Sequence, residues 1–165
     1  MTRSPLAGRI DLLVFDFDGV LTDNRVLVLE TGQEAVMCSR ADGMAFDMFR
    51  AAGLSTLIMS TERNPVVAAR AAKLRVPVLQ AVADKGRALT EHCAAAGVDL
   101  GRVAFVGNDL NDLPAFAVAG VRIAVADAHP RVRTAASIVL ATRGGDGAAR
   151  EIAESLLGLE YKGVA

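Results

Sequence analysis

Two aspartates stand one residue apart at the end of an apolar run near the start of the chain. Asp16 and Asp18 belong to LLVFDFDGVLTD, residues 12–23, and a glycine directly follows Asp18. Neighbouring carboxylates repel each other and lose hydration when they are buried, so a bound divalent cation or phosphoryl group best explains the pair. These residues therefore indicate metal-assisted phosphate chemistry.

Other polar groups follow later apolar runs. Ser60 comes directly after the apolar residues 55–59. Lys85 stands beside Asp84 at the start of a predicted helix, and GNDLND, residues 107–112, follows a further apolar run. In a parallel α/β sheet, ligands bind at the carboxyl ends of the strands, so we expect these groups to lie near the two aspartates.

Phosphoryl transfer gives each of these residues a possible task. Asp16, the first polar group after the strand, can attack phosphorus and form an aspartyl phosphate. Asp18 can protonate the leaving group and later deprotonate water. Asp109 can complete the coordination of Mg²⁺, while Lys85 and Ser60 can stabilise the phosphoryl oxygens.

Each residue also has a common structural role. An Asp-Gly pair after a strand is an ordinary turn, and Ser60 alone is a typical turn hydroxyl. Asp84 fits a helix cap with a solvated lysine beside it, and residues 107–112 fit a polar loop that caps a helix. His92 and His129 are more often surface or helix residues than metal ligands. The occurrence of all the polar groups in order, each at a strand or helix junction, favours catalysis.

The elements that would position these groups alternate along the chain. Between the apolar runs lie Ala-rich stretches with helical spacing, which predicts an α/β fold: a doubly wound, Rossmann-like parallel sheet with helices on both faces. The expected helix ends agree with this fold. Asn64 before Pro65 is typical of a helix start, Asp84 and Gly97 fit the start and the end of another helix, and Asp109 fits the start of a further one. The predicted strands are residues 12–15, 55–59, 76–79, 103–106, 121–125 and 138–140.

One segment departs from the alternation. Residues 25–38, RVLVLETGQEAVMC, have two apolar-rich runs around Thr31 and Gly32, which predicts a β-hairpin flap inserted after the first strand. Nothing is long enough to form a separate cap domain, so we expect one domain over residues 1–165. The substrate would be covered by the flap, by a C-terminal tail at about 143–165, or by another copy of the protein.

Composition excludes several other classes of protein. The 165-residue chain is 52% hydrophobic, which is ample for one core, and its net charge of −1 and 4% aromatic content argue against a nucleic-acid partner. Cys38 and Cys93 lack paired spacing, so we expect reduced thiols in or near the core. Residues 1–9 contain no long apolar segment and no apolar run could span a bilayer, which favours a soluble cytoplasmic protein without a membrane partner.

The sequence resembles the haloacid dehalogenase superfamily of phosphohydrolases over nearly its whole length. Four motifs carry the resemblance in order: DFDGVLTD at 16–23, Ser60, Lys85 and GNDLND at 107–112.

The resemblance to that family implies that this protein has a nucleophile, a proton donor and a bound Mg²⁺. Asp16 would be the nucleophile, and Asp18 the general acid and base whose backbone carbonyl also binds the metal. Asp109 would be a further metal ligand, and Asp112 would support these ligands without binding the metal itself.

A closer resemblance is to small lidless members that act on sugar-acid phosphates: 3-deoxy-manno-octulosonate 8-phosphate phosphatase and nonulosonate 9-phosphate phosphatases. The hairpin after DGVLTD, RADGMAF at 40–46 and the tail at 124–152 carry it. It implies a homotetramer in which a neighbouring subunit closes each site. It also implies substrate contacts at Thr22, Arg40, Gly43, Glu62, Arg70 and Lys73.

The substrate itself stays open at this point. Glu62 with Arg70 and Lys73 resembles the nine-carbon type, including the phosphatase-like domain attached to some acylneuraminate cytidylyltransferases. Arg70 and Lys73, three residues apart on one helix face, either converge on a substrate carboxylate or are solvated surface charges. Asp146 stands where these relatives commonly carry arginine, which leaves open whether a different ligand is preferred.

The sequence thus predicts a Mg²⁺-dependent phosphomonoesterase acting on a small sugar-acid phosphate through an aspartyl phosphate. The alternative is a non-catalytic, tetramerising domain that partners an acylneuraminate cytidylyltransferase. A scaffold has no reason to keep both Asp16 and Asp18, so the enzyme is favoured. A phosphomutase would need to shield its phosphoenzyme from water, and a lidless chain shows no means of doing so.

Overall fold

A six-stranded parallel sheet forms the centre of the molecule. The computed structural model describes residues 6–161, so the ends of the predicted domain and tail, residues 1–5 and 162–165, lie outside the described residues. The strand order is β5-β4-β1-β6-β7-β8. The strands are β1 (Leu12–Phe15), β4 (Ser55–Met59), β5 (Val78–Leu79), β6 (Val103–Gly107), β7 (Val121–Ala124) and β8 (Ile138–Val139).

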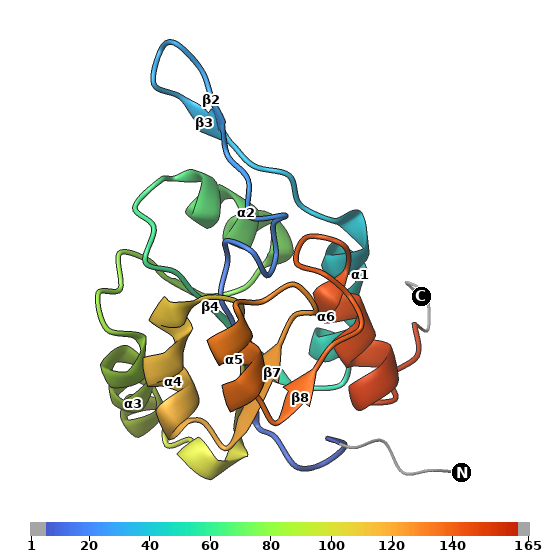
Figure 1. The fold of residues 1–165 in the computed structure, drawn as a ribbon. Helices are drawn as coiled ribbons and strands as arrows, with labels where there is room; N and C mark the ends of the chain where they lie inside the picture. Colours follow the sequence, from blue (N-terminus) through green and yellow to red (C-terminus); the bar gives the residue numbers. More distant parts are fainter. Residues whose placement is uncertain (1–5, 162–165) are drawn as a thin grey trace.

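Helices cover both faces of this sheet. On one side α1 packs against α6, and on the other α3 packs against α4, which contacts α5; Figure 1 shows the two groups with the sheet between them. The predicted doubly wound α/β fold is therefore confirmed. The helices are α1 (Arg40–Ala51), α2 (Val66–Leu74), α3 (Lys85–Ala96), α4 (Leu113–Val118), α5 (Pro130–Ala135) and α6 (Ala148–Glu151), with short turns η1 (Leu100–Arg102), η2 (Leu110–Asp112) and η3 (Ile152–Leu156).

The chain changes direction between β1 and β6. From β1 it passes to β4 and β5 on one side, and then returns to β6, β7 and β8 on the other. The Asp16 backbone N–H donates to the Val106 carbonyl oxygen at 2.9 Å, which ties the ends of the two central strands together. Open α/β sheets bind ligands at such a reversal, outside the carboxyl ends of the strands.

Burial explains why the central strands are continuous apolar runs. Every residue of β1 and β6 is buried, because helices cover both faces. The edge strands β5 and β8 have two residues each and are partly exposed. The sequence predicted that the third strand begins at Val76, but it begins at Val78, because Pro77 has no N–H to donate to a strand ladder.

Local capping sets the helix ends as predicted. The Asp84 side chain accepts from the Arg87 N–H at 3.0 Å, and Gly97 ends α3 in the left-handed conformation. Asn64 Oδ1 accepts from the Val66 N–H at 3.0 Å at the start of α2. Asp109 also opens a helix, although the first turn is the 3₁₀ turn η2 and the α-helix begins only at Leu113.

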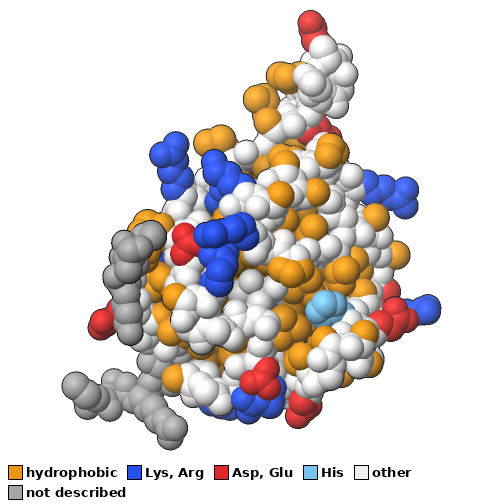
Figure 2. Space-filling model, turned by 180° about the vertical axis from the view of Figure 1, so that it is seen from behind, with side chains coloured by type: hydrophobic (Ala, Val, Ile, Leu, Met, Phe, Trp, Pro, Cys, Tyr) orange, Lys and Arg blue, Asp and Glu red, His pale blue; other side chains and the backbone are white. Residues whose placement is uncertain are grey.

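A two-stranded hairpin projects from the carboxyl end of the sheet (Figure 1). Its strands are β2 (Leu27–Val28) and β3 (Glu34–Ala35), paired antiparallel around a turn in which the Leu29 N–H donates to the Gln33 carbonyl oxygen. We call residues 25–38 the flap. Its large apolar side chains are exposed at Val26, Leu27, Val28, Leu29 and Met37, as Figure 2 shows, whereas Val36 is partly buried against the core.

Predictions about the two cysteines and about membrane-spanning segments can also be compared with the structure. Cys93 is buried, Cys38 is half-buried, and both are free thiols, as predicted. Across residues 6–161, no helix combines the length and the apolar character that crossing a membrane requires.

Candidate active site

A small polar pocket lies where β1 and β6 end. Its volume is about 90 Å³, and every one of its lining side chains carries a carboxylate, amide or hydroxyl group. The sequence predicted that Asp16, Asp18 and Asp109 would meet here, and the structure brings all three to this pocket. The lining residues are Asp16, Asp18, Asn24, Thr61, Asn108, Asp109 and Asn111.

A buried ammonium group holds two of the carboxylates behind this pocket. Lys85 Nζ lies 2.6 Å from Asp16 Oδ1 and 2.6 Å from Asp112 Oδ1. All three side chains are almost completely buried, and the lysine comes from the first residue of α3. A buried charge is tolerated when it is paired, so the lysine and the two aspartates form one ionic unit.

Burial and the neighbouring opposite charge shift the pKa of each group in this unit in opposite directions. Burial, followed by the nearby Asp112 carboxylate, raises the pKa of Asp16, whereas Lys85 opposes the rise. For Lys85, burial disfavours the ammonium form, but Asp16 and Asp112 outweigh burial and raise the pKa of the lysine. The lysine therefore stays protonated, and it lowers the cost of an ionised carboxylate at Asp16.

The loop after β1, residues 16–24, is held by its own side chains, and we call it the catalytic loop. Asp16 Oδ1 accepts from the Phe17 N–H at 2.7 Å. Thr22 Oγ1 accepts from the Gly19 N–H at 3.0 Å and from the Asn24 N–H at 3.2 Å. Thr22 is fully buried, so this residue, predicted to contact substrate, closes the loop instead.

Asp112 organises the loop after β6 in the same way. Its Oδ2 accepts from the Asn108 N–H at 2.8 Å and from the Asp109 N–H at 3.2 Å, while its Oδ1 contacts Lys85. This position behind the pocket fits the supporting role expected for Asp112. The Asp109 carboxylate accepts from the Leu110 N–H at 2.7 Å and forms a capping box with Asp112 at the start of η2.

Asn108 is a site residue that the sequence reasoning did not single out. With its nitrogen facing the catalytic loop, Nδ2 donates to the Asp18 backbone oxygen at 2.9 Å and to Asp16 Oδ2 at 3.1 Å. In the opposite orientation three oxygens face one another, an arrangement that a cation between them would stabilise. Its place directly after an apolar strand could have indicated a site residue, but the sequence analysis assigned roles to Asp109 and Asp112 in the same loop instead.

These donors fit a hard divalent cation. Within residues 6–161, no three carboxylate, imidazole or thiolate groups surround a common point. A cation here would therefore take carboxylate oxygens together with backbone or amide oxygens, and Asp16, the Asp18 carbonyl and Asn108 supply these kinds. Mg²⁺ accepts such mixed oxygen sets and usually keeps several waters, whereas zinc prefers nitrogen and sulfur.

The loop after β4 forms the opposite wall. Ser60 is buried at the end of the strand, and its Oγ accepts from the Glu62 N–H at 3.0 Å, so Thr61 rather than Ser60 lines the pocket. Glu62 is exposed. Burial and then the Glu62 charge raise the pKa of Asp18, which favours the protonated form that an acid catalyst needs.

The flap is fastened to this wall. Asn64 Nδ2 donates to Glu34 Oε2 at 2.8 Å, which joins β3 to the residue before α2. The contact ties the flap to the loop that forms one wall of the pocket.

The remaining predicted substrate residues lie around α1 and α2. Arg40 and Lys73 are exposed, and Gly43 is half-buried beside Arg70. Arg70 Nη2 donates to the Ser39 carbonyl oxygen at 2.8 Å, and its buried Nε has no protein partner. The Arg70 side chain therefore folds back onto the start of α1.

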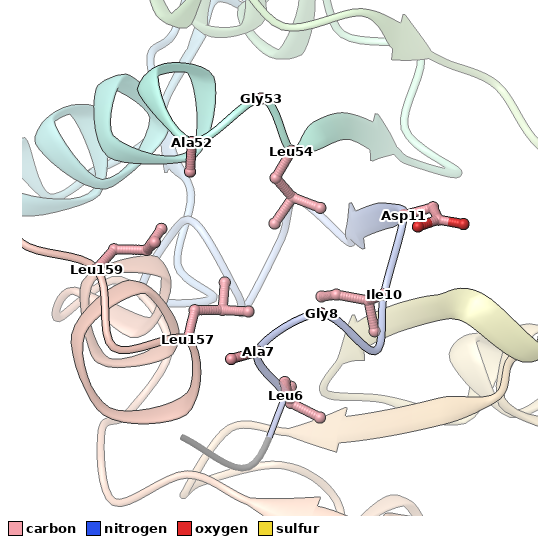
Figure 3. Close-up of a pocket in the computed structure, with 10 residues that line it drawn as sticks. All are labelled: Leu6, Ala7, Gly8, Ile10, Asp11, Ala52, Gly53, Leu54, Leu157 and Leu159. Carbon is pink, nitrogen blue, oxygen red and sulfur yellow. The ribbon is translucent and has the colours of Figure 1, made fainter. Parts of the chain in front are cut away.

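A larger hollow lies at the opposite end of the sheet (Figure 3). Its volume is about 390 Å³, and its lining is mainly apolar, with Leu6, Leu54 and Leu157 facing it. The carboxylate that it includes, on Asp11, points away toward Arg102, which it binds as an ion pair. This hollow lacks the convergent polar groups that phosphate chemistry requires, so the small polar pocket is the candidate site.

Comparisons of the sequence with known proteins point to a family of hydrolases. The sequence profile of haloacid dehalogenase-like hydrolases matches residues 50–152. A 3-deoxy-D-manno-octulosonate 8-phosphate phosphatase from Haemophilus influenzae is 33% identical over 154 residues, covering 93% of this chain and 86% of the relative.

Solved structures give the same result. A protein from Streptomyces avermitilis, described as a HAD-family hydrolase, superimposes with a TM-score of 0.91 at 52% identity, covering 94% of this chain and 89% of the other. A 3-deoxy-D-manno-octulosonate 8-phosphate phosphatase from Moraxella catarrhalis, solved with a magnesium ion, a phosphate ion and KDO, has a TM-score of 0.84 at 29% identity, covering 87% and 83%.

Proposed function

Since this chain belongs to the haloacid dehalogenase-like hydrolases and is a phosphatase, we propose that it hydrolyses a small sugar-acid phosphate with the help of Mg²⁺. The observation that carries the proposal is the buried unit in which Lys85 Nζ lies 2.6 Å from Asp16 Oδ1. An attacking carboxylate needs to be rigid and ionised, and this contact favours both conditions.

The proposed reaction has two steps. A carboxylate oxygen of Asp16 attacks phosphorus while the bond from phosphorus to the ester oxygen breaks, and Asp18 gives its proton to the leaving alkoxide. Asp18, now ionised, then takes a proton from the water that attacks the aspartyl phosphate. Phosphate leaves, and the Asp16 carboxylate is restored.

Other residues of the site stabilise charge. Lys85 and the Ser60 hydroxyl are proposed to face the phosphoryl oxygens. Asp16, the backbone carbonyl of Asp18 and Asp109 would hold Mg²⁺, with the Asn108 amide oxygen beside them. When bound, Mg²⁺ supplies positive charge that offsets the repulsion between the carboxylates and the phosphate.

The substrate class comes from the relatives rather than from the pocket. Two of the compared proteins are named for the phosphate ester of an eight-carbon sugar acid. We propose a nonulosonate 9-phosphate or a 3-deoxy-octulosonate 8-phosphate, with Glu62, Arg70 and Lys73 contacting the sugar acid. Asp146 is exposed, and its negative charge disfavours a substrate carboxylate or phosphate close to it. Experiment has to choose between the two sugar-acid phosphates.

We also propose that the single domain forms a homotetramer in which a neighbouring subunit closes each site. The support is the flap, where Leu27 is 63% exposed and Met37 is 72% exposed. A cluster of exposed apolar side chains on a projecting hairpin is typical of a protein interface. The alternative of a non-catalytic scaffold is set aside, because the family is one of hydrolases and two of the compared proteins are named as phosphatases.

Two assays test the proposal. Wild type should hydrolyse p-nitrophenyl phosphate only with a divalent cation, and Asp16→Ala should abolish turnover. A panel of eight-carbon and nine-carbon keto-acid phosphates and common hexose phosphates should then give the highest kcat/KM for a keto acid. A preference for hexose phosphates would defeat the sugar-acid assignment and leave the chemistry intact.

A further inference from the structure

A second loop lies directly against the catalytic loop, far from it in sequence. Residues 142–147, which we call the tail loop, lie between β8 and α6, and Figure 1 shows this orange segment beside the blue catalytic loop. The Gly145 N–H donates to the Val20 carbonyl oxygen at 3.0 Å. The two loops therefore share a backbone hydrogen bond as well as packing.

The contact at Gly144 leaves no space for a side chain. A Cβ atom at Gly144 would lie less than 3.0 Å from the carbonyl oxygen and carbon of Gly19, closer than real Cβ atoms come to such neighbours. The obstacle is backbone, so a side chain at Gly144 would fit only if one of the two loops moved. Gly144 itself is buried.

The opposite side of the catalytic loop is equally close to a neighbour. A Cβ atom at Gly19 would overlap the Asn108 side chain, and that side chain also contacts the Asp18 backbone oxygen. Gly19 thus lies between Gly144 on one side and Asn108 on the other. A push from the tail loop would be passed to Asp18, the residue directly before Gly19.

Two acidic side chains anchor the tail loop, and at its first residue Glu151 Oε2 accepts from the Thr142 N–H at 2.8 Å. Asp127 Oδ1 accepts from the Gly144 N–H at 2.9 Å, and its Oδ2 lies 3.4 Å from Arg143 Nη2. The Ala126 N–H donates to the Thr142 carbonyl oxygen at 3.0 Å. The segment after β7 therefore fixes the tail loop at Gly144, where that loop meets the catalytic loop.

We propose that Gly144 and Asp127 are positioning residues for catalysis, because they hold the catalytic loop at the place where Asp16 and Asp18 react. The proposal rests on the proposed phosphatase chemistry. Reacting groups must be held to within a fraction of an ångström, and a misplacement of about 1 Å can lower a rate about 100-fold. A loop fixed between two close neighbours meets that requirement.

The first test adds one methyl group. Gly144→Ala should lower kcat about 10-fold to 100-fold with little change in KM, since the loop is displaced but the substrate contacts remain. Gly120→Ala is the matched control: its Cβ would also lie less than 3.0 Å from a backbone carbonyl oxygen, that of Gly101, near the amino end of β7. It should lower Tm similarly and leave kcat at the wild-type value.

The second test removes a hydrogen bond without adding atoms. Asp127→Ala loses the acceptor for the Gly144 N–H and should lower kcat several-fold, whereas Asp127→Asn keeps an acceptor oxygen and should retain most of kcat. Asp11→Ala breaks an exposed ion pair with Arg102 at the opposite end of the sheet, so its kcat should be unchanged. These variants decide the question if Gly144→Ala does not fold.

Amide hydrogen exchange provides a readout independent of activity. Exchange in a peptide covering residues 16–24 should be faster in Asp127→Ala than in wild type, and unchanged in Asp11→Ala. Wild-type kcat and wild-type exchange in Asp127→Ala would overturn the proposal. An inactive wild-type protein would instead count against the proposed function. The amide exchange rates of residues 16–24 would still test whether Asp127 holds the catalytic loop.

Discussion

Asp42, in the first turn of α1, is a buried carboxylate whose titration should be measurable in the stability of the fold. It is 1% exposed, its Oδ1 accepts from the Ala149 N–H at 2.9 Å, and its Oδ2 has no protein partner. Burial raises the pKa of Asp42 from 3.8 to about 6; the N–H groups at the start of α6 and the charge of Arg70 oppose the rise, and nearby Asp146 adds to it.

The sign of the effect follows from proton linkage. Between pH 3.8 and pH 6 the unfolded chain releases the Asp42 proton while the folded protein keeps it. The stability present below pH 3.8 is therefore lost as the pH rises through about 6. The shift of about 2.2 pKa units corresponds to about 3 kcal/mol at 1.36 kcal/mol per unit.

The perturbation is Asp42→Asn, which keeps an oxygen acceptor for Ala149 and cannot ionise. Any cost of burying the new amide is independent of pH. The free energy of unfolding of the variant minus that of wild type should therefore increase by up to about 3 kcal/mol between pH 4 and pH 7.5. Urea unfolding at several pH values measures it, and other titrating groups cancel in the difference.

Asp47 offers a matched control on the same helix. A hydrogen bond from Arg50 lowers the pKa of this exposed carboxylate, so Asp47→Asn should give a small difference of the opposite sign. A difference for Asp42→Asn that does not change with pH would refute the reasoning that burial has raised the pKa of Asp42.

Three further predictions concern the site and the flap. Lys85→Met leaves the Asp16 and Asp112 carboxylates unpaired, so it should lower the free energy of urea unfolding by about 3 to 5 kcal/mol and lower kcat at least about 100-fold. The control Lys73→Met, at an exposed lysine, should change the free energy of unfolding by less than about 0.5 kcal/mol. An equal loss of stability in both variants would contradict the buried ionic unit. Chelation with EDTA should abolish hydrolysis of p-nitrophenyl phosphate and added Mg²⁺ should restore it, whereas full activity in EDTA would exclude the metal. Leu27→Asp should shift sedimentation from a tetramer to smaller species, and an unchanged tetramer would remove the flap from the interface.

The parts of this protein that the sequence predicts well are those set by local chemistry. The strands at Leu12–Phe15 and Ser55–Met59 were predicted at their observed bounds, because covered strands require an uninterrupted apolar run. Asp84 and Gly97 defined α3 because capping depends on neighbouring backbone groups. The flap followed from two short apolar runs around a turn.

What escaped prediction depends on contacts between distant residues. Asn108 meets Asp18 across the junction of two strands, and Gly144 meets Gly19 only after the whole sheet has formed. Arg70 Nη2 donates to the Ser39 carbonyl oxygen, 31 residues away in sequence, which helical spacing alone does not reveal. Thr22 has the side chain of a ligand-binding residue, yet its hydroxyl is used inside its own loop.

The central claim is that Asp16 is the residue that accepts the phosphoryl group. The direct measurement is mass spectrometry of enzyme quenched during turnover of p-nitrophenyl phosphate with Mg²⁺ and treated with borohydride, which reduces an acyl phosphate to an alcohol. The account predicts that fragmentation finds the reduced side chain at position 16, and that Asp16→Asn shows none. Reduction at Asp18, or none anywhere while wild type turns over, would contradict it.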